Sequence, residues 1–235
     1  QFDAHTLEIV GIEALARWDH PTKGILGPDA FLGIAESLKV VATIDDIILN
    51  QALLQHYRLT ANGIDIPKVS VNVSAQRLRD ETLIDRIKAM NFRPGTLSFE
   101  LLESISLDGH DGELIPQIEK IRALGIEIDI DDFGTGYASL SYLADMPFSK
   151  IKIDRGFVAD LPTRPTSRAI VAAITNLARE LDMQITAEGV ETEEQLLILK
   201  AAGCTNAQGY FFARPRPIAD IKLHAQGARP EAVSK

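Results

Sequence analysis

The stretch Ile126-Glu127-Ile128-Asp129-Ile130-Asp131-Asp132-Phe133-Gly134-Thr135-Gly136 decides the fold. At the two-residue period of a β-strand, its isoleucines share one face, and Glu127, Asp129 and Asp131 share the other. The run breaks at Asp132 and enters a Gly-Thr-Gly turn. A strand edged with carboxylates would repel itself on an ordinary surface. The stretch therefore predicts a strand whose aliphatic face packs on helices and whose acidic face lines a site for cations.

Composition sets the limits of the fold and of the binding partners. The chain has 235 residues, 46% of them hydrophobic, which suits one large domain with its own core. Its only cysteine, Cys204, excludes an intrachain disulfide and suits the reducing cytoplasm. The net charge of −9 disfavours a long nucleic acid, and no apolar stretch is long enough to span a membrane. The abrupt start at Gln1 predicts that residues 1–235 are one domain excised from a larger protein.

Strands and helices alternate along the rest of the chain, without an internal repeat. Period-two patterns predict seven strands, at residues 8–18, 68–74, 97–103, 127–133, 150–154, 183–190 and 206–212. Helical patterns lie at residues 43–62, 81–90, 111–124, 167–181 and 192–203. A doubly wound sheet would need strands that are apolar on both faces, whereas these have one aliphatic and one polar face. We therefore predict a (β/α)8 barrel of the TIM type, with an eighth strand at Gln1–Phe2 and upstream.

Function in such barrels lies at the carboxyl ends of the strands. The last inward polar residues of the strands are Glu13, Asn72, Glu100, Asp131, Lys152, Glu188 and Gln208, with Asp132 and Glu191 just beyond. Oxygen ligands of this kind suit Mg²⁺ or Mn²⁺, and there is no Cys/His spacing typical of zinc. Converging carboxylates would repel each other unless cations neutralise them. Two divalent ions about 3.5–4 Å apart, which clamp a phosphoryl group, are the usual solution.

Each of these residues also has a simpler interpretation. Glu13 or Glu100 alone at a strand end is more often part of a rim salt bridge, Asn72 a turn residue, and Lys152 a counterion for a neighbouring Asp. Glu191 could simply begin the helix that follows it. The coincidence of polar groups at the ends of all these strands favours a site. The five histidines show no paired spacing, so we interpret them as structural or exposed.

Several motifs together resemble the EAL domain family, the cyclic di-GMP phosphodiesterases. They are Glu13-Ala14-Leu15 with Ala16-Arg17-Trp18, Val71-Asn72-Val73-Ser74, Glu100-Leu101-Leu102-Glu103-Ser104, Asp131-Asp132-Phe133-Gly134-Thr135-Gly136-Tyr137, Lys152-Ile153-Asp154, Glu188-Gly189-Val190-Glu191 and Gln208-Gly209. They occur in the order typical of the family and cover nearly the whole chain. A single tripeptide would be weak support, but seven motifs in register are specific.

The resemblance implies a barrel whose first strand is antiparallel to the others, and a Mg²⁺- or Mn²⁺-dependent hydrolysis of cyclic di-GMP to linear pGpG. It implies metal ligands at Glu13, Asn72, Glu100, Asp131, Asp132 and Glu188. Lys152, Glu188 and Glu191 would be catalytic, with either Lys152 or Glu188 as the general base. Leu15, Arg17, Asp132 and Gln208 would contact the substrate, and Glu103 would anchor the loop from Asp131 to Leu140.

The resemblance also implies a homodimer, a covalently linked GGDEF or sensory domain, and inhibition by Ca²⁺. Leu102 replaces a common Thr and Ala138 a common Ser, which affects the loop more than the chemistry. Two alternatives stay open. One is a domain of this kind that binds cyclic di-GMP without cutting it, and the other is an unrelated metal-dependent barrel hydrolase or lyase.

Overall fold

One curled sheet of eight strands organises the molecule. The structure, a computed structural model, describes residues 1–103, 111–136 and 140–218. The order of the strands is β1 (Phe2–Asp3), β10 (Asn206–Ala207), β9 (Gln184–Ala187), β8 (Lys150–Ile153), β7 (Ile126–Phe133), β6 (Leu97–Leu102), β5 (Val69–Asn72) and β2 (Ile12–Ala14). β1 pairs antiparallel with β10, and every other pair in this sheet is parallel. The predicted α/β barrel-type fold and its antiparallel first strand are therefore confirmed.

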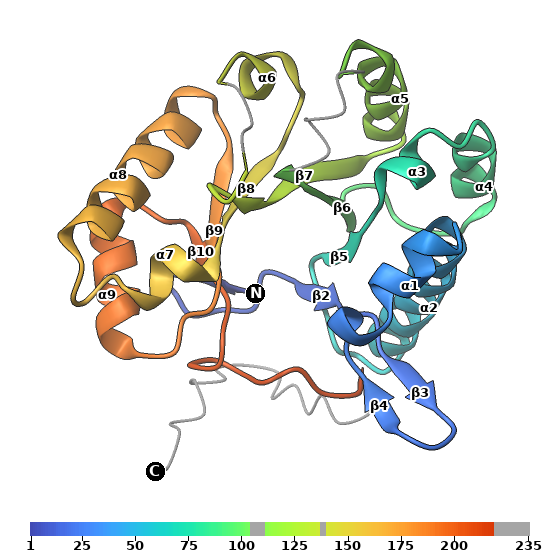
Figure 1. The fold of residues 1–235 in the computed structure, drawn as a ribbon, viewed down its shortest axis with the longest axis horizontal. Coiled ribbons are helices and arrows are strands. Elements are labelled where there is room, and N and C mark those ends of the chain that lie inside the picture. Colours follow the sequence, from blue (N-terminus) through green and yellow to red (C-terminus); the bar gives the residue numbers. More distant parts are fainter. Residues whose placement is uncertain (104–110, 137–139, 219–235) are drawn as a thin grey trace.

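The two edges of the sheet come together at the start of the chain. The amide of Val10 donates to the carbonyl of Gln1 at 3.0 Å, and Phe2 forms an antiparallel bridge with Ile9. Residues 9 and 10 lead directly into β2, so these contacts join the edge strand β1 to the opposite edge. Figure 1 shows the resulting ring, with the N-terminus between β10 and β2 and the helices on the outside. The strand predicted at the very start of the chain is thus present.

The long helices lie close to the ranges that the sequence predicts. They are α2 (Val41–Ala61), α4 (Leu83–Ala89), α5 (Asp111–Ala123), α8 (Pro165–Glu180) and α9 (Glu193–Ala202). At the start of α9, the Thr192 hydroxyl accepts a hydrogen bond from the Gln195 backbone amide at 3.2 Å. In return, the Gln195 side-chain oxygen accepts one from the Thr192 backbone amide at 3.0 Å. Gly203 ends the same helix with a φ of 96°, a left-handed conformation that favours glycine. The capping residues in the sequence therefore set both ends of this helix.

The shorter elements were not predicted. They are the hairpin of β3 (Trp18–His20) and β4 (Gly24–Leu26), the 3-10 turn Pro28–Ala30, and the helices α1 (Leu32–Ser37), α3 (Ala75–Leu78), α6 (Leu140–Asp145) and α7 (Arg155–Ala159). The predicted strand at 8–18 was too long, because Ile9 bridges Phe2 in the antiparallel direction and Trp18 belongs to the hairpin. The predicted strand at 206–212 ends early, because the amide of Phe212 turns back to the carbonyl of Gly209.

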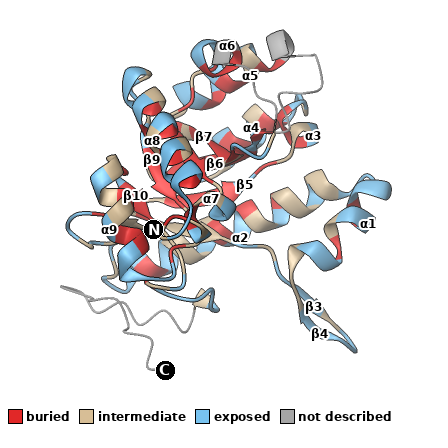
Figure 2. Ribbon diagram, turned by 60° about the vertical axis from the view of Figure 1, so that its left-hand side comes forward, coloured by how far each residue is buried: buried red, intermediate tan, exposed pale blue. Residues whose placement is uncertain are grey.

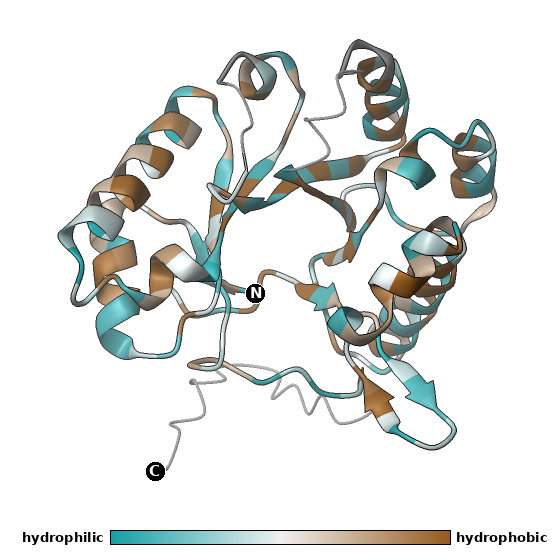
Figure 3. Cartoon of the chain, viewed as in Figure 1, coloured by the Kyte–Doolittle hydropathy of each residue, from teal (hydrophilic) through white to brown (hydrophobic). Residues whose placement is uncertain are grey.

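The two faces of each strand divide as the alternation predicts. Aliphatic and aromatic side chains such as Phe99, Ile128 and Ile151 are fully buried in the hydrophobic core. On the opposite face, the buried Ser98 hydroxyl donates to Asp129 at 2.6 Å, and the Lys150 Nζ lies 3.3 Å from the same carboxylate. Figure 2 shows β6 to β9 of the sheet as mostly buried, and Figure 3 shows hydrophilic and hydrophobic residues alternating along β6 and β7. The ring therefore has a polar interior.

Among the described residues, none of the helices combines the length and the apolar character needed to cross a membrane. His110, His224 and Ala138 lie outside the described residues.

Candidate active site

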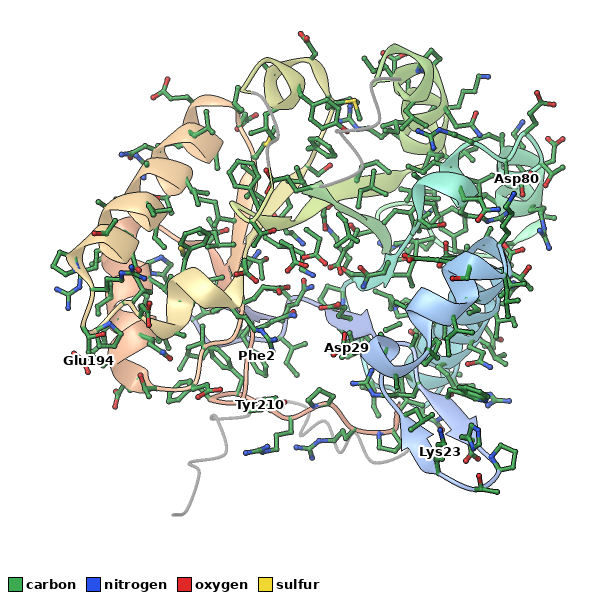
Figure 4. All side chains as sticks on the ribbon, viewed as in Figure 1. Phe2, Lys23, Asp29, Asp80, Glu194 and Tyr210 are labelled. Atoms are coloured by element: carbon green, nitrogen blue, oxygen red, sulfur yellow. The ribbon has the colours of Figure 1, made fainter. Side chains whose placement is uncertain are left out.

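Seven of the predicted site residues, each on or directly after a different strand, gather at one end of the ring. Glu13 lies on β2, Asn72 ends β5, Glu100 lies on β6, Asp131 on β7 and Lys152 on β8, while Glu188 and Gln208 directly follow β9 and β10. Because parallel strands share one direction, their carboxyl ends bring these distant residues together. Side chains with oxygen and nitrogen atoms fill the middle of the ring in Figure 4. The polar interior thus ends in a cluster of carboxylates.

Lys152 lies at the centre of this cluster. Its Nζ is 2.8 Å from Glu100, 2.8 Å from Glu188, 3.0 Å from Asp131 and 3.3 Å from Glu13. Only 1% of the lysine side chain is exposed, so the ammonium depends on these carboxylates in place of water. Burial alone would lower the pKa of Lys152, but the carboxylates around it, led by Glu100, hold that pKa well above its usual value. The surrounding carboxylates therefore favour the charged form of Lys152.

The carboxylates form two groups that share one member. Ligand oxygens of Glu13, Glu100 and Asp131 lie within 4.8 Å of one another, and so do those of Asp131, Asp132 and Glu188. Asn72 adjoins the first group, because its Nδ2 donates to Glu13 at 3.2 Å. A half-turn of that amide would present its oxygen instead. The two carboxylate groups are therefore neighbouring candidate cation sites that share Asp131.

A bulge in β7 allows adjacent aspartates to face the same site. Residues next to each other on a strand normally point to opposite faces. The pairing of β7 with β8 shifts register between Ile130 and Phe133, and Asp132 has a φ of 53°, in the left-handed region. The Asp132 carboxylate therefore joins Asp131 and Glu188, within the strand and not in a loop after it.

The carboxylates outnumber the cation that neutralises them. Five carboxylates face one lysine in this cluster. Burial raises the pKa of Glu188 to about 7, although Lys152 opposes the shift. Burial, together with the charge of Asp131, raises the pKa of Asp132 to about 6. Burial also raises the pKa of Glu100 well above its usual range, so the cluster favours extra positive charge.

Gln208 and Glu13 form a second link across the cluster. The Gln208 Nε2 donates to Glu13 Oε2 at 2.7 Å and lies 3.3 Å from Glu188 Oε1. Burial would raise the pKa of Glu13, but Lys152 and this amide stabilise its ionised form and lower the pKa. Gln208 thus connects carboxylates of both groups.

Three predicted residues are not brought into the cluster. The exposed Arg17 donates to the neighbouring carbonyl of Ala16 at 2.7 Å, and Leu15 is 39% exposed. Glu191 is also exposed, and its backbone amide donates to Gln195 Oε1 at 2.8 Å. Among the contacts of the described residues, none joins the side chain of Arg17 or Glu191 to the carboxylates.

Glu103 contacts the glycine turn that follows β7. Its buried Oε2 accepts hydrogen bonds from the amides of Gly134 and Gly136, at 2.8 and 2.9 Å. A Cβ on Gly136 would lie 3.0 Å from Glu103 Cδ, and a Cβ on Gly134 would lie 2.6 Å from the Phe157 ring. The turn therefore depends on glycine at both positions, and residues 137–139 of the same loop lie outside the described residues.

Two neighbours of the cluster were not singled out from the sequence. Asp154 caps α7 through the amide of Gly156 at 2.9 Å, and its charge also raises the pKa of Asp132. The Lys152-Ile153-Asp154 motif already contains this residue, two positions from Lys152. Gln195 accepts from the amides of Glu191 and Thr192, and so fixes the segment after Glu188. The sequence signal that could have identified Gln195 is Thr192 followed three positions later by Gln, a spacing typical of a helix N-terminus.

Comparison with known proteins identifies the family and the relatives that the chain resembles. The model of the EAL domain family matches residues 1–215. The chain is 38% identical over 229 residues to the cyclic di-GMP phosphodiesterase NbdA of Pseudomonas aeruginosa, covering 96% of this chain and 29% of that protein. It is 37% identical to the oxygen sensor protein DosP of Escherichia coli, covering 94% of this chain and 28% of DosP. The chain therefore spans less than a third of the length of these relatives.

Solved structures of EAL domain proteins share the fold of this chain. The MucR phosphodiesterase, in complex with c-di-GMP, superposes with a TM-score of 0.85 at 37% identity, over 92% of this chain and 89% of that one. The FimX EAL domain from Pseudomonas aeruginosa, at 23% identity and a TM-score of 0.77, shares the fold over 91% of this chain and 87% of its own. The chain belongs to the EAL domain family.

Proposed function

We propose that this chain is a metal-dependent phosphodiesterase that hydrolyses cyclic di-GMP to linear pGpG. The observation that carries the proposal is the pair of carboxylate groups joined by Asp131. A pair of cation sites that share a ligand suits the clamping of one phosphodiester. NbdA and RocR, which the chain resembles, bear the name cyclic di-GMP phosphodiesterase.

The donor set fits Mg²⁺ or Mn²⁺. Both groups consist of Asp and Glu side chains, and hard divalent cations prefer such oxygen ligands. Glu13, Asn72, Glu100 and Asp131 would hold one ion, and Asp131, Asp132 and Glu188 the other. Bound there, the ions would polarise the phosphodiester and make an attacking water more acidic. We expect the larger Ca²⁺ to inhibit, because its looser coordination would misplace the reacting groups.

The side chains around the ions would handle the water and its proton. Lys152 and Glu188 are 2.8 Å apart, and either could take the proton from the attacking water. In the first case Lys152 would have to enter the reaction neutral, and in the second it would orient the water by donating a hydrogen bond. The pH–rate profiles of Lys152 and Glu188 variants separate these cases. Glu191 would support the water network from the following loop.

Substrate contacts would surround this centre. Leu15 and Arg17 follow β2, and the exposed Arg17 has a planar fork suited to a phosphate. Asp132 would contact the substrate from β7 and Gln208 from the end of β10, and Glu103 would hold the glycine turn in place. Residues 1–235 would act as a single domain in the cytoplasm, linked to a GGDEF or sensory domain and paired as a homodimer.

The decisive experiment measures conversion of cyclic di-GMP by the purified chain. With Mg²⁺ or Mn²⁺ we expect linear pGpG as the product by chromatography, no turnover after addition of EDTA, and recovery when metal is restored. Glu13→Ala should abolish turnover. Glu127→Gln is the matched control, because Glu127 pairs with Lys68 at the opposite end of β7. Tight binding of the nucleotide without any product, with either metal, would instead indicate a cyclic di-GMP sensor.

A further inference from the structure

The connection between β5 and α3 is held by the side chain of Asp45 on α2. The Asp45 Oδ2 accepts two hydrogen bonds from Ser74, one from the amide at 2.9 Å and one from the hydroxyl at 2.6 Å. The same hydroxyl accepts from the amide of Arg77 at 3.2 Å and so caps α3. One carboxylate oxygen therefore fixes both the backbone and the side chain of Ser74.

Ser74 lies two residues after Asn72, at the edge of the carboxylate cluster. Between them, the amide of Val73 donates to the carbonyl of Glu100 at 3.0 Å and continues the ladder of β5 and β6. Asn72 reaches Glu13 at 3.2 Å through Nδ2. The pairing of β5 with β2 ends at Val71, so beyond that residue the chain is held by β6 on one side and by Asp45 through Ser74. Without Asp45, the segment that follows Asn72 would lose one of these two attachments.

The neighbouring residue makes the position of Asp45 rigid. Asp46 forms ion pairs with the buried Arg77 and with Arg86, and Arg77 also contacts Asp80 at 2.6 Å. These pairs tie α2 to α3 and α4, so α2 cannot move independently of the segment that follows β5. Burial raises the pKa of Asp45, while the hydrogen bonds from Ser74 stabilise its charged form. Burial of a carboxylate is costly unless hydrogen bonds offset it, and here the two bonds from Ser74 do so.

We propose that Asp45 is a positioning residue for the metal centre, acting through Ser74 on the orientation of Asn72. The proposal rests on the proposed function, in which Asn72 is a metal ligand. Groups that hold metal ligands in place are worth about 10–100-fold in metal affinity or activity. Asp45 touches neither the substrate nor the ions in this scheme. Asp45 and Ser74 are 29 residues apart in the sequence, and Asp45 acts on the metal centre through its two hydrogen bonds to Ser74.

Isothermal titration of the full chain with Mn²⁺ tests the proposal. Asp45→Ala should weaken Mn²⁺ binding by about tenfold in folded protein. Asp45→Asn should stay within about threefold of the original affinity, because the amide oxygen can still accept both hydrogen bonds. Glu127→Gln, which removes a carboxylate from an ion pair at the far end of β7, should leave the affinity unchanged. A role in stability alone would lower the melting temperature and not the Mn²⁺ affinity.

Ser74→Ala keeps the experiment decisive if Asp45→Ala does not fold. This variant removes the hydroxyl and leaves the ion pairs of Asp46 intact, and it should also weaken Mn²⁺ binding. Folded variants that bind Mn²⁺ as well as the original chain would overturn the proposal. If the original chain itself binds no Mn²⁺, the proposed metal centre fails, and the role of Asp45 fails with it. The two failures are therefore distinguishable.

Discussion

The Lys152 Nζ lies 2.8 Å from Glu100 Oε2, and the exposed fractions of the two side chains are only 1% and 0%. Both groups lie in the interior of the ring, at the point where the proposed ions would bind. Such a pair is stable only while both partners are present, because a lone buried charge loses its hydration without compensation. Lys152 thus neutralises the same carboxylates that would coordinate metal.

Removing the lysine should therefore cost stability and strengthen metal binding. For Lys152→Met we expect the free energy of unfolding to fall by about 3–5 kcal/mol without metal, the usual cost of breaking a buried ion pair. We expect Mn²⁺ to stabilise this variant more than it stabilises the original chain, because the carboxylates then lack their internal cation. Denaturant titration with and without Mn²⁺ measures both effects. Turnover should be lost in the same variant.

Lys150→Met is the matched control for that change. Lys150 forms a buried pair with Asp129 at 3.3 Å, on the same strand but one layer away from the cluster. Its loss should destabilise the chain similarly, while the gain in stability from Mn²⁺ stays at the original value. Equal stabilisation of Lys152→Met and the original chain by Mn²⁺ would contradict the view that lysine and metal share these carboxylates.

Cys204 should be unreactive in the folded chain. Burial raises the pKa of its thiol to about 12, which leaves a thiolate fraction of ~10⁻⁴ at pH 8, against about a quarter in an unfolded chain. A thiol reagent should therefore label the protein rapidly only in denaturant. Labelling of the native chain at the denatured rate would show that the thiol is accessible.

The same shift gives a dependence of stability on pH. The folded pKa of Cys204 lies above its unfolded value, so the unfolded chain loses this proton first and stability falls as the pH rises above about 8.5. Between pH 7 and pH 10 the loss should be about 2 kcal/mol. The difference in unfolding free energy between the original chain and Cys204→Ala should shrink by that amount over this range.

Much of the fold could be predicted because each strand carries its own pattern. The alternation of isoleucines and acids over 126–131 predicts which face of β7 is aliphatic, and the structure buries Ile126, Ile128 and Ile130 in the hydrophobic core. The start of β2 could not be predicted in this way. Ile9 continues the alternation but pairs with Phe2, and only contact between distant segments determines that pairing.

In the site, too, local sequence patterns predicted some features, and contacts between distant segments determine the others. The type of residue at the strand ends was sufficient to propose Glu13, Glu100 and Asp131 as one group, since parallel strands end at one edge. The bulge that turns Asp132 inward has no signal in the alternation, and it appears only in the register of β7 against β8. The contact of Asp45 with Ser74 depends on how α2 packs on the sheet, so no local pattern in the sequence indicates it.

The anchor of the glycine turn can be tested separately. Glu103→Ala removes the acceptor for the amides of Gly134 and Gly136, and should lower the free energy of unfolding by about 1–3 kcal/mol. Because Asp132 is two residues before Gly134, we also expect weaker Mn²⁺ binding. Glu103→Gln is the control, since its amide oxygen can accept the same bonds, and it should recover most of both losses. Unchanged Mn²⁺ affinity in Glu103→Ala would mean that the turn does not position Asp132.

The number of bound ions tests the sharing of Asp131 directly. Asp131 belongs to both carboxylate groups, whereas Glu100 belongs only to the first and Asp132 only to the second. Titration calorimetry should find two Mn²⁺ ions on the original chain, one tightly bound ion on Glu100→Gln or on Asp132→Asn, and none on Asp131→Asn. Removal of metal by EDTA should lower the melting temperature of the original chain and leave that of Asp131→Asn unchanged, because bound ions stabilise only the folded state. If Asp131→Asn still bound one ion tightly, the two sites would be independent, and a single phosphodiester could not be clamped between ions that share this carboxylate.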